Sequence, residues 1–114
     1  MEACELDKKS CVPCKGGVPT LTDTEIKKLV PNVPGWKVIE VDAIKRIEKT
    51  YEHKDFVEAM KFVNKVADIA EGEGHHPDLH IHWNKVRIEV WTHKIKGLHE
   101  NDFILAAKIE KLRS

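Results

Sequence analysis

The chain has 114 residues, of which 41% are hydrophobic and 33% are charged, values typical of one soluble globular domain with its own core. Lys plus Arg and Asp plus Glu number 19 each, so the totals show neither the basic excess of a nucleic-acid binder nor an acidic tail. No apolar run approaches the roughly 18 residues that suggest a membrane span. We therefore expect a soluble protein that binds neither nucleic acid nor membrane.

The N-terminal segment, residues 1–20, is charged and then rich in Gly and Pro, so we expect it to be loosely ordered. Its first ten residues, MEACELDKKS, suit neither a signal peptide nor a transit peptide, which indicates a cytoplasmic protein. The three cysteines are Cys4, Cys11 and Cys14, and the last two have CxxC spacing. No second CxxC completes a zinc site, and the flanks lack the strand and helix of a thioredoxin-like site. We favour a reduced peripheral pair, with weak structural zinc helped by a distant histidine as the alternative.

Residues 21–114 are predicted to form a single domain, and its first element is a short helix. Thr22-x-x-Glu25 is a capping box that marks the start of this helix. The helix is expected to end before Pro31, because proline cannot continue a helix hydrogen-bonding pattern.

A first hairpin follows, with WKVIEV at 36–41 and IKRIEKTY at 44–51 as its strands. Asp42 and Ala43 are expected to form the tight turn between them. Ile44 and Ile47 do not alternate strictly, which predicts a bulge in the second strand or a misplaced strand boundary.

The longest helix is predicted from the cap signal Asp55-x-x-Glu58 to the glycines at 72 and 74. One broad apolar face at helical spacing is expected to face the core, and it consists of Phe56, Ala59, Met60, Val63, Val66, Ala67 and Ala70. We interpret this stripe as packing surface and not as a cofactor site.

A second hairpin is predicted from LHIHW at 79–83 and KVRIEVWTH at 85–93, which both alternate. In the latter strand one face is apolar and the other polar, with Arg87, Glu89, Trp91 and His93 on the polar face. Trp83 is expected to pack on the core side. The last helix is predicted over 102–112, with Asp102 in its first turn, where a carboxylate suits the helix dipole.

The predicted order of elements is therefore α-β-β-α-β-β-α. Two hairpins separated by a helix predict an α+β domain in which a single four-stranded antiparallel sheet has three helices packed on one face. Such a sheet has two edge strands to protect, and pairing of edges across a dimer is one solution.

Four histidines fall within residues 71–83 (EGEGHHPDLHIHW), and three interpretations of them are open. His80 and His82 alternate with apolar residues, so they point away from the core and could simply be solvated. They could bind zinc or copper, but no Cys or carboxylate falls at ligand spacing, so no metal site is predicted. His53 and His99 are expected to have no special role.

Proton transfer is the third interpretation, because imidazole titrates near working pH. His75 and His76 directly precede Pro77, which favours extended geometry for the residue before it. His93 ends a predicted strand, and Glu71 is close enough in sequence to orient one ring. Three imidazoles and a carboxylate around one cleft can supply both a general acid and a general base. No nucleophile motif such as G-x-S-x-G is evident, which argues against a covalent intermediate.

These residues form a pattern over 71–102, Glu71-x3-His75-His76-Pro77-x5-Trp83-x9-His93-x8-Asp102. It resembles the signature of the pterin-4a-carbinolamine dehydratases, and the CxPCxGG stretch looks like that of bacterial and plant-type members. The resemblance extends from about Leu21 to the C-terminus. It implies removal of water from a 4a-hydroxytetrahydropterin to give the quinonoid dihydropterin, which recycles the cofactor of aromatic amino acid hydroxylases.

The resemblance also implies roles for individual residues. His75, His76 and His93 would form the acid–base set, with His76 the most sensitive to substitution and Glu71 orienting or tuning a ring. The implied substrate-binding residues are Gly74, His75, His76, Trp91, Thr92 and His93. Asp102 is expected to cap a helix and not to act in catalysis. The pterin is the substrate, so no cofactor is implied, and the implied assembly is a homodimer or homotetramer.

The chain departs from the family pattern at three places. Gly74 stands where animal members carry an acidic residue, Leu79 where they carry Trp, and His99 where a Ser or Thr helix cap is common. Some members of the family instead bind proteins, as a dimerisation cofactor of a homeodomain transcription factor or as chloroplast assembly factors. The full histidine set favours the enzyme, and a non-catalytic binding role is the alternative. Exposed apolar residues on the long helix would favour the binding role.

Overall fold

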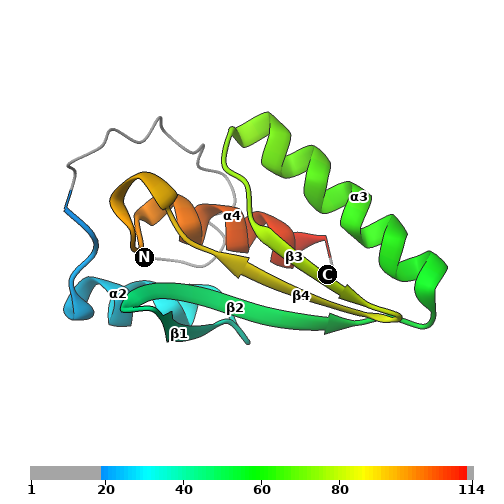
Figure 1. Cartoon of the computed structure of the whole chain (residues 1–114), viewed down its shortest axis with the longest axis horizontal. Helices are drawn as coiled ribbons and strands as arrows, with labels where there is room; N and C mark the ends of the chain where they lie inside the picture. The colour runs from blue at the N-terminus through cyan, green and yellow to red at the C-terminus, as the bar shows by residue number, and fades with distance from the viewer. Residues whose placement is uncertain (1–18, 113–114) are drawn as a thin grey trace.

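The computed structural model describes residues 19–112, in which four antiparallel strands form one sheet accompanied by three α-helices (Figure 1). The elements are α2 (Asp23–Leu29), β1 (Lys37–Val41), β2 (Ile44–Glu52), α3 (Phe56–Glu73), β3 (Asp78–His82), β4 (Lys85–Val90) and α4 (Glu100–Lys111), with short 3-10 helices η1 (Val30–Asn32) and η2 (His93–Ile95). The predicted class and the order α-β-β-α-β-β-α are confirmed.

The expectations for residues 1–20, including the Cys11 and Cys14 pair, fall almost entirely outside the described residues and stay predictions. Within residues 19–112, no helix combines the length and the apolar character that crossing a membrane requires.

The α2 helix begins with the predicted capping box. The Thr22 backbone N–H donates to Glu25 Oε1 at 2.8 Å, and the Glu25 N–H donates to Thr22 Oγ1 at 3.2 Å. The bond from the Thr22 backbone favours the charged form of Glu25 and so lowers the pKa of that carboxyl. Because the folded-state pKa is depressed, this stabilisation is present above the unfolded pKa and is lost as pH falls through the folded one.

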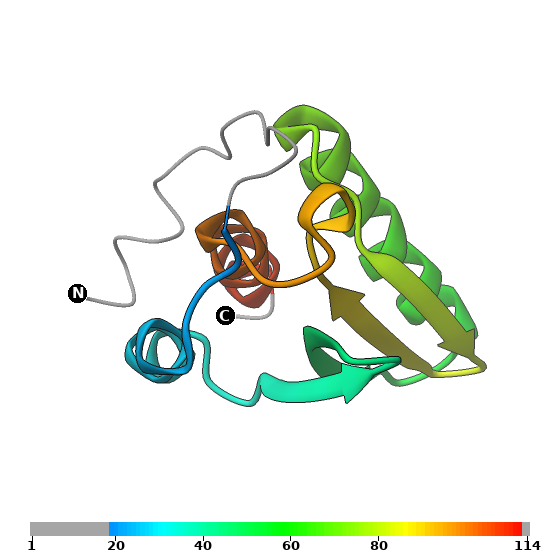
Figure 2. The same ribbon diagram turned by 60° about the vertical axis from the view of Figure 1, so that its left-hand side comes forward.

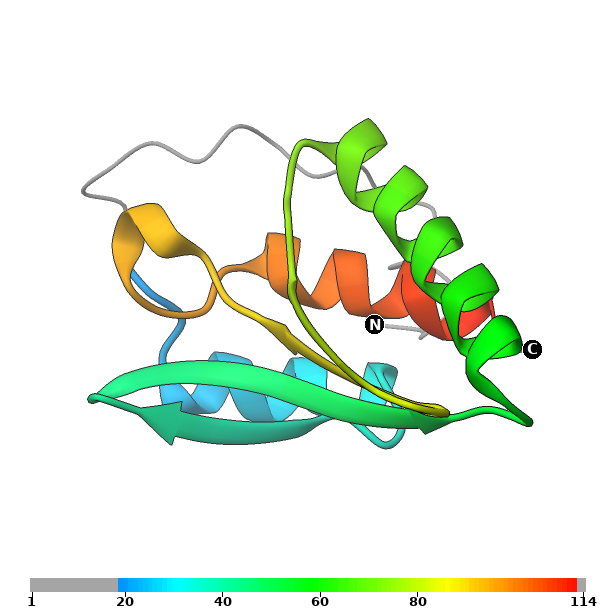
Figure 3. The same ribbon diagram turned by 45° about the vertical axis from the view of Figure 1, so that its right-hand side comes forward.

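The strands lie in the order β1-β2-β4-β3, so the two hairpins join through β2 and β4 and leave β1 and β3 at the edges (Figure 3). The register is uninterrupted from Lys37↔Glu48 to Val41↔Ile44 and from Ile47↔Val90 to Glu52↔Lys85, so the predicted bulge is absent. The broken alternation has a different cause. Ile47 is buried in the core, whereas Ile44 lies half-buried on the opposite face of the same strand.

The core lies between one face of the sheet and the helices, and α4 is its centre. Figures 1 and 2 show α4 between α2 and α3. Most side chains of α4 are buried, including Phe103, Leu105 and Ile109 at 0% exposure. The β4 residues on this face are also fully buried, and they belong to the apolar face that alternation predicted: Val86, Ile88 and Val90. Burial of each such side chain contributes roughly 1.5–3 kcal/mol, so the sheet face and α4 hold the fold together.

The α3 helix differs from its prediction in which residues it buries. Phe56 and Ala67 are exposed, while Phe62 is buried against the rings of Tyr51 and His53 at centroid distances of 4.9 and 4.8 Å. The set of α3 residues that face the core therefore differs slightly from the prediction, because the end of β2 supplies aromatic partners for Phe62. The predicted stop at residue 72 is also wrong, since that glycine lies inside the helix.

The second hairpin turns at Trp83 and Asn84. Trp83 has a φ of +52° and is 62% exposed, so its predicted place on the core side is wrong. A residue with positive φ in a tight hairpin turn leaves the alternation of the strand before it. Two hydrogen bonds hold the turn: the His53 N–H donates to Asn84 O at 2.8 Å, and Asn84 Nδ2 donates to His53 O at 2.9 Å.

The connection before α4 passes very close to Thr20. A Cβ added at Gly97 would lie 2.4 Å from Thr20 Cγ2, so we expect Gly97→Ala to lower the free energy of unfolding by about 1–3 kcal/mol. Adding Thr20→Ser should recover part of this loss, because it removes that methyl group. Gly72→Ala is the control: its Cβ meets nothing within 4 Å, and alanine in a helix stabilises by roughly 0.5–1 kcal/mol. Urea unfolding measures the stability of all three variants. An unchanged midpoint in Gly97→Ala would contradict the close packing of Gly97 against Thr20.

Candidate active site

The C-terminus of α3 directs two adjacent histidines out of the helix. Gly74 has a φ of +65°, its N–H donates to Glu71 O at 3.3 Å, and the His75 N–H donates to Ala70 O at 3.2 Å. This pair of bonds is a Schellman ending, in which the left-handed residue reverses the chain. Glycine adopts that conformation without steric cost. The helix end therefore places His75 and His76 in the short loop that leads into β3.

His75 contacts the buried carboxylate of Asp102. Its Nε2 lies 2.6 Å from Asp102 Oδ1, and the side chain of Asp102 is 0% exposed. The other oxygen, Asp102 Oδ2, accepts hydrogen bonds from Thr92 Oγ1 and from the His99 backbone N–H, both at 2.9 Å. A carboxylate accepts hydrogen bonds and donates none, so the His75 ring carries its proton on Nε2 in this contact. Asp102 thus joins the loop after α3, the segment after β4 and the start of α4.

The cap of α4 corrects two expectations. His99 is the N-cap, and its Nδ1 accepts a hydrogen bond from the Asn101 N–H at 3.0 Å, so the expectation that His99 has no special role is wrong. The helix also begins at Glu100, two residues earlier than predicted. Asp102 does cap the helix as expected, but its contact with His75 was not anticipated.

His76 and Glu71 form an open pair beside this loop. His76 Nε2 lies 3.3 Å from Glu71 Oε2, and the two side chains are 63% and 74% exposed. Solvent screens such a pair, so it adds little to stability. The arrangement leaves the His76 ring accessible to a molecule that arrives from solvent while Glu71 holds one of its nitrogens.

His93 lies on the ring of Trp91 with a centroid distance of 3.9 Å and an interplanar angle of 18°. Two further residues hold Trp91 in place. Its Nε1 donates to Asp78 Oδ2 at 3.1 Å, and the guanidinium carbon of Arg46 lies 4.5 Å from the ring centroid. The prediction that His93 ends this strand is wrong, since β4 ends at Val90 and His93 begins η2. His93 and Trp91 therefore lie just beyond the end of the sheet.

Two short segments therefore meet at Asp102, the loop between α3 and β3 and the segment between β4 and α4. Figure 3 shows both segments at the same end of the sheet. They contain every residue predicted to bind substrate: Gly74, His75 and His76 in one, and Trp91, Thr92 and His93 in the other. Glu71 joins them through His76. The structure joins the two segments at Asp102, and the catalytic and binding roles of these residues stay predictions.

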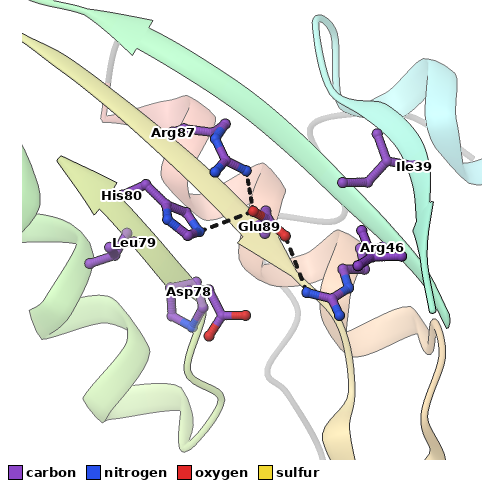
Figure 4. Close-up of a pocket in the computed structure, with 9 residues that line it drawn as sticks. Ile39, Arg46, Asp78, Leu79, His80, Arg87 and Glu89 are labelled. Carbon is purple, nitrogen blue, oxygen red and sulfur yellow. Dashed lines mark hydrogen bonds and ion pairs between the residues drawn. The ribbon is translucent and has the colours of Figure 1, made fainter. Parts of the chain in front are cut away.

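A hollow of about 590 Å³ lies beside these segments, on the sheet face opposite the core (Figure 4). Its lining residues are Ile39, Val41, Arg46, Pro77, Asp78, Leu79, His80, Arg87 and Glu89. The sequence pattern does not predict this hollow. Alternation indicated that Arg87 and Glu89 share the polar face of their strand, but not that Arg46 would lie next to them.

Glu89 lies at the centre of this hollow and is only 6% exposed. Its Oε1 accepts a hydrogen bond from Arg46 Nη1 at 3.2 Å, its Oε2 lies 3.0 Å from His80 Nε2, and Arg87 Nη1 bonds to the same Oε2. His80 therefore has a carboxylate partner. Among residues 19–112, no three or more His, Cys, Asp or Glu side chains are grouped so that they could hold a metal ion.

Residues 19–112 match the sequence profile of the family described as pterin 4 alpha carbinolamine dehydratase. A relative from Methylococcus capsulatus is 49% identical over 112 residues, which cover 98% of this chain and 96% of that protein. Another from Rickettsia canadensis is 52% identical over 106 residues, covering 92% and 94%. Both bear names that place them among the pterin-4-alpha-carbinolamine dehydratases. The crystal structure of a transcriptional coactivator/pterin dehydratase from Brucella melitensis has a TM-score of 0.76 and 29% identity, covering 84% of this chain and 100% of that one.

Proposed function

The chain belongs to the pterin 4 alpha carbinolamine dehydratase family, and from this premise we propose that it removes water from a 4a-hydroxytetrahydropterin to give the quinonoid dihydropterin. One observation carries the proposal. The loop with His75 and His76 and the segment with His93 converge through the buried carboxylate of Asp102. This convergence supports the proposal, because the reaction requires more than one proton-transfer group near the substrate.

The reaction needs two proton transfers. A general acid protonates the hydroxyl group on C4a, the C4a–O bond breaks, and water leaves. A general base takes the proton from N5, whose electron pair forms the C4a=N5 double bond. One positioned imidazole for each transfer can contribute about 10²–10⁴-fold.

Each imidazole suits this work in a different way. The accessible ring of His76 exchanges a proton directly with substrate, while Glu71 orients it. His75 is held by Asp102 with its proton on Nε2, which leaves Nδ1 as the basic nitrogen of the neutral ring. His93, stacked on Trp91, or His75 assists departure of the hydroxyl group. Backbone groups at 74–76 and 91–93 hydrogen-bond the flat pterin ring.

The test is the dehydration rate of freshly generated 4a-hydroxytetrahydropterin with and without the protein. We expect the wild type to exceed the spontaneous rate. The triple variant His75→Gln, His76→Gln, His93→Gln should fall to the spontaneous rate while its circular dichroism stays that of a folded protein. His82→Gln, an exposed histidine outside the site, is the matched control and should retain the wild-type rate. A folded wild type that does not exceed the spontaneous rate contradicts the proposal.

The same premise extends to assembly and cellular context. We propose a cytoplasmic homodimer or homotetramer that serves an aromatic amino acid hydroxylase by recycling its spent pterin, with no cofactor of its own. Support for assembly comes from β1 and β3, whose outer edges have no strand partner within residues 19–112. Unpaired edges favour strand pairing with a second copy. Light scattering in solution distinguishes a monomer from these assemblies.

A non-catalytic protein-binding role is a second candidate. Two apolar residues at the start of α3 support it, since Phe56 is 48% and Val57 is 61% exposed. The Brucella melitensis relative is also described as a transcriptional coactivator. The triple histidine variant separates the two functions, because a binding role would survive loss of the three imidazoles.

A further inference from the structure

The three histidines of the candidate site differ in how their rings are held. The rings of His75 and His76 each contact a carboxylate oxygen, at 2.6 and 3.3 Å. The ring of His93 is exposed and has no hydrogen-bond or ion-pair partner within residues 19–112. Its ring contact there is the stack on Trp91, with a centroid distance of 3.9 Å. The direction in which His93 presents its nitrogens therefore depends on how firmly Trp91 itself is held.

The indole of Trp91 is fixed by a carboxylate on the neighbouring strand. Trp91 lies beyond the last residue of β4, so the backbone hydrogen bonds of the sheet do not fix it. Its Nε1, the single donor of an indole, donates to Asp78 Oδ2 at 3.1 Å. Asp78 is the first residue of β3 and pairs with Glu89 of β4, so the sheet holds the backbone that carries this acceptor.

The stability of the sheet does not account for an aspartate at position 78. Asp78 lies directly opposite Glu89 on the adjacent strand (Figure 4), and two carboxylates in such a cross-strand pair destabilise a sheet. The cations near this pair all contact Glu89: Arg46, Arg87 and His80. No ion pair joins Asp78 to a cation in the part of the chain that the structure describes. The indole contact is therefore the interaction that explains the carboxylate of Asp78.

Asp78 also makes a second connection between the two segments of the site. Asp102 joins the loop after α3 to the segment after β4 through His75 and Thr92, inside the core. Asp78 directly follows the end of that loop and contacts Trp91 on the opposite face of the sheet. The buried contact determines where the segments meet, and the second contact determines how the stacked rings are turned.

We propose that Asp78 is a positioning residue for the dehydration: it holds the indole of Trp91, and the indole sets the orientation of the His93 imidazole. This inference rests on the proposed function, because it assigns His93 a proton transfer in that reaction. Asp78 acts through the two rings and transfers no proton itself. A displacement of about 1 Å in a reacting group can cost ~10²-fold in rate, so loss of this support should be measurable in turnover.

The kinetic test removes the acceptor and then restores it. Asp78→Ala should lower kcat for 4a-hydroxytetrahydropterin about 10–100-fold, the equivalent of one hydrogen bond to a charged group, with KM nearly unchanged. Asp78→Asn keeps an amide oxygen that can accept from the indole and should recover most of this loss. Asp68→Ala, which removes an exposed carboxylate on α3, is the matched control and should retain the wild-type kcat. Adding Asp78→Ala to His93→Gln should cause no further loss, because Asp78 then has no ring left to position.

Nuclear magnetic resonance follows the imidazole directly and requires no turnover. The indole shields the ring protons of His93, so they should resonate upfield of those of the exposed His82. The His93→Gln variant identifies these signals, because it removes them. In Asp78→Ala the signals of His93 should move toward those of His82, whereas in Asp78→Asn they should keep their wild-type position.

The outcomes separate this inference from the proposed function. Wild-type kcat in Asp78→Ala, unmoved His93 signals in that variant, an equal loss in Asp68→Ala, or a further loss in the double variant overturns the inference. A wild type that catalyses no dehydration, but whose His93 signals respond to Asp78→Ala, instead overturns the proposed function. The role of Asp78 in the reaction then falls with it, while the contact between Asp78 and the stacked rings stands.

Discussion

His76→Ala is expected to lower kcat/KM for pterin dehydration by ~10²–10⁴-fold, the usual contribution of a positioned acid or base. The side chain is 63% exposed and its only hydrogen-bond partner among the described side chains is Glu71, so the free energy of unfolding should change by no more than ~0.5 kcal/mol. Stopped-flow kinetics on freshly generated substrate measures the first quantity, and urea unfolding measures the second.

A matched control for this variant is His82→Ala, which removes another exposed imidazole of the same stretch without touching the loop after α3. It should keep both the rate and the stability of the wild type. Equal rates in His76→Ala and the wild type would remove His76 from the mechanism. Equal losses in both histidine variants would point to a general effect of the substitutions on the protein.

Asp102→Asn is expected to weaken both the fold and the reaction. Three donors converge on this fully buried carboxylate, and an amide of the same shape turns one of its own donors toward them. We expect the free energy of unfolding to fall by about 1.5–3 kcal/mol and kcat/KM by about 10–100-fold, because a hydrogen bond to a charged group is worth that much. Urea unfolding and kinetics per folded molecule measure the two effects.

The control for Asp102→Asn must lose stability without touching the histidines. Leu105→Ala serves, since this α4 side chain is fully buried in the core and its removal costs about 2–5 kcal/mol. Assayed at a temperature where both variants are folded, Leu105→Ala should retain wild-type kcat/KM. If the two variants lose activity in parallel, Asp102 supports the fold only and does not position His75.

Features that depend on residues a few positions apart can be predicted from the sequence. The Thr22–Glu25 capping box and the glycine ending of α3 at Gly74 each involve one turn of chain, so local composition determines them. Strict alternation likewise predicted that Val86, Ile88 and Val90 of β4 face the core. Predictions of burial were wrong where an element contacts residues that are distant in the sequence. Phe62, for example, is buried because Tyr51 in β2 packs against it.

The candidate site likewise has features that the sequence predicts and features that it does not. The residue types and spacing of Glu71, His75, His76 and His93 were sufficient to predict proton chemistry at the loop after α3, because the ability of imidazole to transfer protons is a property of the side chain itself. The sequence did not show which side chains these residues contact. Asp102 lies 27 residues from His75 and was expected only as a helix cap.

The sequence by itself determined the elements, their order, the capped start of α2, the glycine ending of α3 at Gly74 and the set of titratable side chains, since these follow from local hydrogen bonding and from periodicity. Only the tertiary structure decided that β2 pairs with β4. That pairing brings Arg46 to Glu89 across 43 residues and forms the hollow beside Trp91. It also decided that α4 presents Asp102 to His75. Both results come from burial of a shared core. The free energy of that burial depends on contacts between residues far apart in the chain, so no local stretch of sequence determines it.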